Sequence, residues 1–362
     1  MQGISEMLCI WPISGALYEY VSVFVDQEVG EAVGIAYWFT NAMGFAAILM
    51  TTAGEVGYWS SDGYLKGFLM LSGIPAILVG INTLGVKLYG WIELVGGSLK
   101  LSFILAIIVT TLAIICGAGQ DSQSVRTKWN GSHYDKDAAK NHPIAFFMCL
   151  SIAAFAFVGV EITAATALEA KASTRQQIVP TTRLKRPATK LPLVVGTVYV
   201  LAAIMLALAV DANSPSLPPQ GWVNPTTQST SKSDSAFVQA AETARITALP
   251  SVITTFIVFT ALTSANTALY VASRTLFGLA RESGSWFGYF GVTDGTRRVP
   301  LRALWASAAF FFVGYFCYLP SQNGVNTVKF LQIASHCPPN SLSGLRRLVK
   351  YELNILHHCM GV

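Results

Sequence analysis

The chain has 362 residues, of which 52% are hydrophobic and only 12% are charged. Soluble domains carry about 25% charged residues, so an ordinary soluble globular protein is excluded. Intrinsic disorder is excluded as well, because it needs low hydrophobicity and high net charge. The net charge of +5, from 24 Lys and Arg against 19 Asp and Glu, is too small to indicate nucleic-acid binding. The composition indicates a membrane protein.

Seven stretches without Asp, Glu, Lys or Arg are long enough to cross a bilayer, whose core of about 30 Å needs roughly 20 apolar residues as helix. In chain order they are residues 32–54, 67–86, 101–120, 141–160, 191–210, 246–273 and 303–328. Most contain interleaved Gly, Ala, Ser and Thr, which allow membrane helices to pack closely. Pro75, within the second stretch, predicts a kink. The pattern predicts an all-α polytopic membrane protein with about seven transmembrane helices.

Basic residues are concentrated in two connecting segments, residues 169–190 and 274–302. Two predicted spans separate these segments, so both lie on one side of the membrane, which the positive-inside rule makes cytoplasmic. The same reasoning places the N-terminus in the cytoplasm. Aromatic residues near the predicted span ends are typical of an interfacial belt: Tyr37, Trp38, Tyr58, Trp59, Tyr89 and Trp91.

Two ionisable residues fall at membrane depth, where a charge is costly and indicates function. Lys100 lies about two and a half helical turns beyond Trp91. The alternative for Lys100 is a side chain that extends to the interface without a further role. Glu161 lies far from both ends of its predicted helix, and its alternative is a neutral carboxylic acid hydrogen-bonded between helices.

Residues 262–267 place four polar side chains in an apolar run. Serine and threonine can bond to carbonyl groups of their own helix, whereas Asn266 is costlier to bury and is predicted to face another helix or a cavity. The sequence has no phosphate-binding Gly-Lys-Ser motif, no nucleophile elbow and no cluster of metal ligands. An enzyme is therefore not predicted, and neither a cofactor nor a metal is expected.

Four groups of residues carry a resemblance to a known family. They are Pro12-Ile13-Ser14-Gly15 with Gly34 and Tyr37-Trp38; residues 86–93 with Lys100; residues 155–161 with 167–170 and 179–180; and residues 264–266 with 270–280 and 299–300. In this order and spacing they resemble a fungal-type amino acid permease of the amino acid–polyamine–organocation superfamily. The likeness runs from about residue 3 to about residue 330.

The resemblance implies a partial five-plus-five inverted-repeat fold with a midplane substrate site, where helices one and six are unwound. It assigns these residues to the substrate site: Phe155, Ala156, Phe157, Val158, Gly159 and Asn266. Phe155 would be the aromatic gate, and Gly159 would tolerate the break in the helix. Glu161 and Lys100 would couple transport to protons, since Lys100 stands where sodium-coupled relatives hold sodium.

The implied function is uptake of an amino acid by alternating access, driven by protons, in the plasma membrane. The predicted helices correspond to family helices three to nine out of about twelve. Residues 1–335 are accordingly expected to be an incomplete permease domain, and residues 336–362 a divergent tail that is either out of frame or genuine. Many fungal members have a glutamate midway along helix three, where this chain has Ile48, so the amino acid carried stays open.

Two other functions remain as alternatives. A non-transporting membrane remnant is suggested by the missing helices. A seven-span receptor is suggested by the helix count alone, but the expected Asp-Arg-Tyr and Asn-Pro-x-x-Tyr motifs are absent from the spans. The oligomeric state is not indicated by the sequence.

Overall fold

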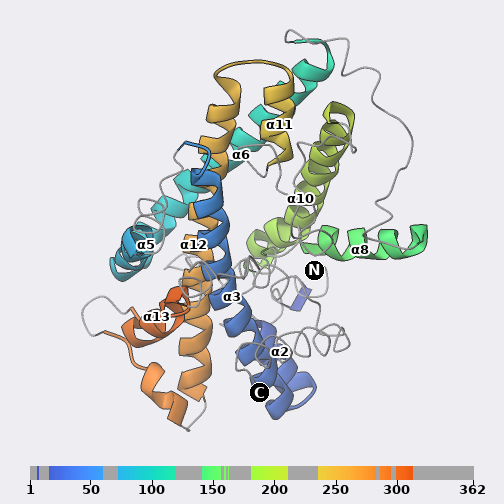
Figure 1. The fold of residues 1–362 in the computed structure, drawn as a ribbon. Helices are drawn as coiled ribbons and strands as arrows, with labels where there is room; N and C mark the ends of the chain where they lie inside the picture. Colours follow the sequence, from blue (N-terminus) through green and yellow to red (C-terminus); the bar gives the residue numbers. More distant parts are fainter. Residues whose placement is uncertain are drawn as a thin grey trace, which may run out of the picture.

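The computed structural model describes residues 6–7, 16–59, 72–118, 141–155, 159, 162, 181–210, 235–282, 286–294 and 299–312. The elements in chain order are α2 (Ala16–Phe24), α3 (Gln27–Val56), α5 (Ile74–Thr83), α6 (Val86–Ile115), α8 (His142–Phe155), α10 (Thr181–Ala209), α11 (Ala236–Thr243), α12 (Leu249–Glu282), the 3-10 helix η2 (Trp286–Phe290) and α13 (Leu301–Ala308) (Figure 1). All of these elements are helices, so the predicted all-α class is confirmed for the described residues.

Four helices are long and apolar enough to cross a membrane: Gln27–Val56, Leu88–Ile115, Lys190–Ala209 and Leu249–Arg281. Each overlaps one of the predicted stretches. The other three stretches contain shorter helices, α5, α8 and α13, within the residues that the structure describes. The described chain thus has four candidate spans of the predicted seven, and it is a polytopic membrane protein.

The start of α6 differs from the prediction. The predicted span began at residue 101, because Lys100 ended the charge-free stretch, but the helix begins at Val86 and contains both Glu93 and Lys100. Gly85, at φ +102°, turns the chain from α5 into α6 in a conformation that favours glycine. The span therefore carries two charged residues within its length.

The predicted kink at Pro75 falls at the edge of the described residues and stays a prediction. Helix α5 begins at Ile74, and Pro75 lies in its first turn. A proline in the first turn disrupts nothing, because the N–H that it lacks would have no helical partner there. Pro75 therefore lies in the first turn of the described helix.

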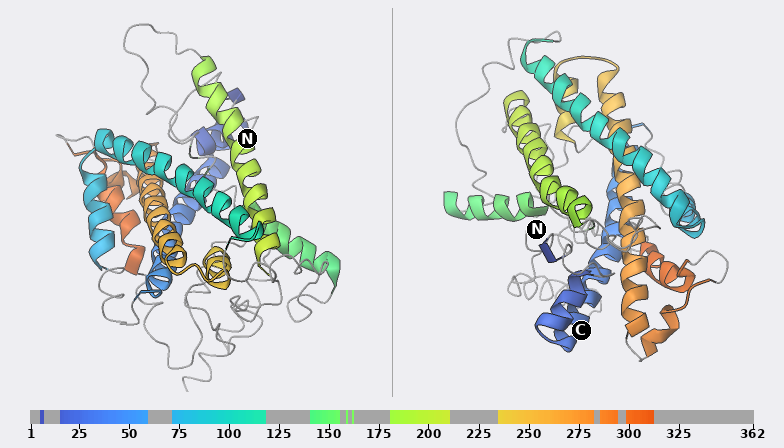
Figure 2. Two further views of the ribbon diagram at one scale, coloured as in Figure 1. Left: turned by 90° about the horizontal axis from the view of Figure 1, so that it is seen from above. Right: turned by 180° about the vertical axis from the view of Figure 1, so that it is seen from behind.

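Helices α3 and α12 form the centre of the structure and run in opposite directions (Figures 1 and 2). Helix α3 begins after Asp26, whose side chain accepts a hydrogen bond from Glu28 N at 3.2 Å as an N-cap. Near this end Gly34 packs against Leu279, and near the other end Trp59 Nε1 donates to Ser251 Oγ at 2.9 Å. These two contacts fix the antiparallel pairing over most of the length of α3.

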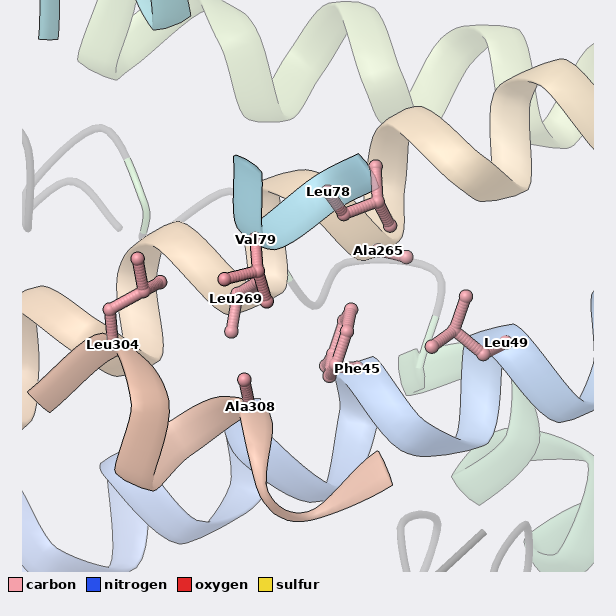
Figure 3. Close-up of a cluster of buried hydrophobic side chains, with 8 residues drawn as sticks. All are labelled: Phe45, Leu49, Leu78, Val79, Ala265, Leu269, Leu304 and Ala308. Atoms are coloured by element: carbon pink, nitrogen blue, oxygen red, sulfur yellow. The ribbon is translucent and has the colours of Figure 1, made fainter. Parts of the chain in front are cut away.

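A buried apolar cluster holds four helices together, and Figure 3 shows its side chains converging between them. The cluster consists of Phe45 and Leu49 from α3, Leu78 and Val79 from α5, Ala265 and Leu269 from α12, and Leu304 and Ala308 from α13. Helix α13 is also joined to α3 by a hydrogen bond from Trp38 Nε1 to Ser307 Oγ at 3.0 Å. Close packing and hydrogen bonds of this kind drive helix association in lipid, where apolar surface alone gains little.

The remaining helices lie around this centre. Helix α6 crosses α12, and α10 packs against α6 and α11. Helix α8 projects away from the bundle (Figures 1 and 2), and its Phe146 and Phe147 are exposed. The site described next lies where α6, α12 and α5 meet.

Candidate functional site

Helices α6 and α12 meet along a seam with a seven-residue repeat. The rings of Tyr89 and Tyr270 stack with their centroids 3.8 Å apart, and those of Phe103 and Phe256 stack at 3.9 Å. Between the two stacks, a Cβ atom on Gly96 would lie 3.4 Å from Thr263 Cγ2. Each contact lies seven residues further along α6 and seven residues earlier along α12 than the one before it. The two helices are therefore antiparallel and stay in register.

The guanidinium of Arg274 lies beyond one end of this α6–α12 seam. Its Cζ atom is 5.1 Å from the centroid of the Tyr270 ring, which is within the range of a cation–π contact. Tyr270 and Tyr89 are both buried. Arg274, Tyr270 and Tyr89 therefore lie one against the next. They lie at the end of α12 that leads into the basic segment 274–302, which is the cytoplasmic end in the predicted orientation.

Lys100 lies on the seam face of α6 and forms an ion pair. Its Nζ atom is 3.8 Å from Glu93 Oε1, and the two side chains are 18% and 32% exposed. Residues seven apart lie on one face of a helix, two turns from each other. Gly96 and Gly97 lie between them in the sequence, and the Gly96 position faces Thr263 of α12. Lys100 thus lies inside the candidate span Leu88–Ile115 with a carboxylate beside it.

Asn266 faces another helix, as the sequence predicted. Asn82 Nδ2, on α5, donates to Asn266 Oδ1 at 2.8 Å and to Leu78 O at 2.8 Å. Both asparagines are buried, at 6% and 3% exposure. Asn82 Oδ1 has no hydrogen-bond partner among the described residues. The assigned substrate-site residue on α12 is therefore linked to α5.

The other polar residues of this segment bond to their own helix. Thr263 Oγ1 donates to Thr260 O at 2.9 Å, and Ser264 Oγ donates to the same carbonyl at 2.9 Å. Thr267 Oγ1 donates to Thr263 O at 3.0 Å. This is the backbone bonding that serine and threonine were expected to make inside a membrane helix.

The segment assigned to the substrate pocket follows α8, which ends at Phe155. Gly159 has φ +100°, a left-handed conformation that ends a helix and favours glycine. Ile162 N donates to Gly159 O at 3.2 Å, which closes a turn. The side chain of Phe155 and the residues Ala156, Phe157, Val158 and Glu161 lie outside the described part of the chain.

The candidates that the structure describes lie on neighbouring helices, but their side chains do not bond to one another. Lys100 pairs with Glu93 on its own helix, and Asn266 pairs with Asn82 on α5. No group of three or more His, Cys, Asp or Glu that could hold a metal occurs among the described residues.

Comparison with known proteins identifies the family. A family model described as amino acid permease matches residues 1–335. The chain belongs to the amino acid permease family. The resemblance found in the four groups of residues is thereby confirmed.

Individual permeases show the same relationship. The chain is 29% identical over 340 residues to a probable amino-acid permease of Schizosaccharomyces pombe, covering 92% of this chain and 54% of the relative. It is 28% identical over 319 residues to a lysine/arginine permease of Candida albicans, covering 87% and 52%, and 24% identical over 321 residues to a basic amino-acid permease of Saccharomyces cerevisiae, covering 87% and 53%. The chain spans about half the length of these permeases.

Two residues of this candidate site were missed by the sequence analysis. Glu93 was quoted only as part of a motif, although its seven-residue distance from Lys100 places both on one helix face. Asn82 is the only polar residue except Thr83 in the helix Ile74–Thr83, and a lone amide in an apolar helix predicts a partner across an interface. The lone amide does not identify its partner helix, which only the packing of α5 on α12 decides.

Replacing Asn82 by alanine is expected to lower the free energy of unfolding by about 1–2 kcal/mol, because it leaves Asn266 Oδ1 without its donor. Thermal unfolding of the detergent-solubilised chain measures the loss. Asn41→Ala is the control, because Asn41 Nδ2 donates only to Tyr37 O in its own helix at 2.9 Å. Equal losses for the two variants would contradict an interhelical role for Asn82.

Proposed function

We propose that this chain carries an amino acid across the membrane by alternating access, with uptake driven by an inward proton gradient. The observation that carries the proposal is the match of the amino acid permease family to residues 1–335. Three of the similar permeases are named for lysine, arginine or basic amino acids, so these are the first substrates to test.

The proposed substrate site lies at the helix break after α8. Phe155 would close over the substrate, and Ala156, Phe157 and Val158 would line the pocket beside Gly159. The positive φ of Gly159 supports such a break, since an interrupted helix frees N–H and C=O groups to bind the carboxylate and ammonium of an amino acid. Asn266 would contribute from α12 with the part of its amide that Asn82 does not use.

Proton coupling is proposed for Lys100 and Glu161. Each would change its protonation between the outward- and inward-facing states, as ionisable residues inside membrane helices commonly do in transporters. The proposed location is the plasma membrane, with the N-terminus in the cytoplasm, where the two basic segments also lie.

Uptake of labelled lysine, arginine and leucine into a permease-deficient host tests this function. We expect uptake above that of the empty vector, and we expect it to rise as the external pH falls, because the inward proton gradient then increases. Glu161→Gln and Lys100→Ala are expected to remove it while membrane expression, measured by immunoblot, is unchanged.

Two results would contradict the proposal. No uptake by a chain that reaches the membrane would favour the non-transporting remnant. Uptake that is independent of pH would argue against proton coupling but not against transport. The two failures are therefore distinguishable in one set of measurements.

A further inference from the structure

Glu93 is a charged residue inside a candidate membrane span to which the proposed function gives no role. It lies within Leu88–Ile115, and its Oε1 atom is 3.8 Å from Lys100 Nζ. Gly96, Lys100 and Phe103 share the face of α6 that meets α12, as the contacts of Gly96 with Thr263 and of Phe103 with Phe256 show. The ion pair therefore lies along the α6–α12 seam.

The elements packed against α6 offer few other charges to Lys100. Helix α5 has no ionisable residue, and α12 has none from Leu249 to Ser273 except Tyr270, which stacks on Tyr89 at one end of the seam. The described side chains of α10 include the exposed Lys190 and Tyr199, and α11 has Glu242. Within the described residues, Glu93 forms the ion pair that is recorded for Lys100.

A single charge inside a bilayer is costly, and pairing with an opposite charge reduces that cost. The pair spans two turns of α6, with the Lys100 Nζ atom 3.8 Å from Glu93 Oε1. The arrangement holds the long Lys100 side chain along its own helix, toward Glu93. Without Glu93 the ammonium would have no described anionic partner and no fixed direction.

We propose that Glu93 is the membrane-embedded counter-ion of Lys100, and that it acts as a positioning residue which holds the Lys100 ammonium in the α6–α12 seam. The ion pair is proposed whether or not the chain transports an amino acid. Its consequence for coupling rests on the proposed function: Lys100 can respond to the proton gradient only from the position in which Glu93 holds it.

A charge-balance cycle tests the ion pair in the full chain. Glu93→Gln and Lys100→Met each leave one charge unpaired, and each is expected to reduce the monodisperse fraction that survives heating in detergent by about fivefold. The double variant has neither charge and is expected to recover most of this loss. The ion pair would be refuted if the single variants resisted heating as well as the wild type does. It would also be refuted if the double variant lost more of its monodisperse fraction than either single variant.

The pH profile of amino acid uptake tests the positioning role. Glu93→Asp is expected to retain the wild-type profile, whereas Glu93→Gln is expected to change it at equal membrane expression. Glu31→Gln, at an exposed position on α3, is the matched control and is expected to leave the profile unchanged. The double variant is expected to recover its heat resistance but not its pH-dependent uptake.

The two measurements separate the possible failures. If Glu93→Gln loses heat resistance but keeps the wild-type pH profile of uptake, Glu93 is only a structural partner and the positioning role is wrong. If the wild-type chain shows no uptake, the proposed function fails, but the heating experiment still decides whether Glu93 is the counter-ion of Lys100.

Discussion

Replacement of Phe45 by alanine is expected to lower the free energy of unfolding by about 2–4 kcal/mol. Phe45 is completely buried and packs in the apolar cluster where α3, α5, α12 and α13 meet (Figure 3). Removing a buried ring costs about 3–5 kcal/mol in soluble proteins, through lost transfer energy and an unfilled cavity. In a bilayer the transfer term is weaker, because the lipid is also apolar, but the lost packing remains.

Chemical or thermal unfolding of the detergent-solubilised chain measures this loss. Phe24→Ala is the control, because the Phe24 side chain is 65% exposed at the end of α2, and it is expected to change stability by less than about 0.5 kcal/mol. Phe45→Leu, which leaves a smaller cavity, is expected to cost less than Phe45→Ala. Equal effects at Phe45 and Phe24 would show that the four-helix cluster does not hold the fold together.

Replacement of Gly30 by alanine is the second large effect, with an expected loss of about 2–3 kcal/mol. A Cβ atom on Gly30 would lie 2.6 Å from Ser22 Cβ and 2.7 Å from Ser22 Cα and N. Two of these three atoms are backbone, which cannot turn aside as a flexible side chain can. Helix α2 must therefore move away from α3 to admit the methyl group.

Gly44→Ala is the matched control for this variant, because it lies on the same helix with nothing within 4 Å of the added Cβ. It is expected to be neutral or stabilising by up to about 1 kcal/mol, since alanine favours a helix more than glycine does. Ser22→Gly is expected to restore only part of the stability of Gly30→Ala, because the Ser22 backbone contacts remain. A Gly30→Ala variant as stable as Gly44→Ala would refute the close packing of α2 on α3.

Much of the helical pattern could be predicted from the sequence, because a bilayer imposes long apolar stretches on every spanning helix. Four of the seven predicted stretches contain a helix of spanning length. The motif with Asn266 and Arg274 also led to the correct family, which the match over residues 1–335 establishes. The hydrogen bonds from serine and threonine to carbonyl groups within α12 could be predicted from side-chain chemistry alone.

The missed features depend on which residues are neighbours in space. A search for charge-free stretches treats every charge as a boundary, so it began the span of α6 after Lys100 and overlooked the pairing with Glu93. The hydrogen bond between Asn82 and Asn266 joins residues 184 positions apart, and no local pattern predicts it. For Phe155, Glu161 and their neighbours, the assigned roles stay predictions.

Trp38 in α3 and Trp59, three residues beyond its end, both donate to serines and also mark a length. Trp38 and Trp59 are 21 positions apart, which is about 32 Å at roughly 1.5 Å per residue and close to the thickness of a bilayer core of about 30 Å. If the two tryptophans lie at the two interfaces, the eleven helical residues before Trp38 extend about 16 Å beyond the lipid core. Helix α2, which packs on this part of α3, would then lie outside the lipid core, and a spectroscopic label attached to it would report the tilt of the α3–α12 pair.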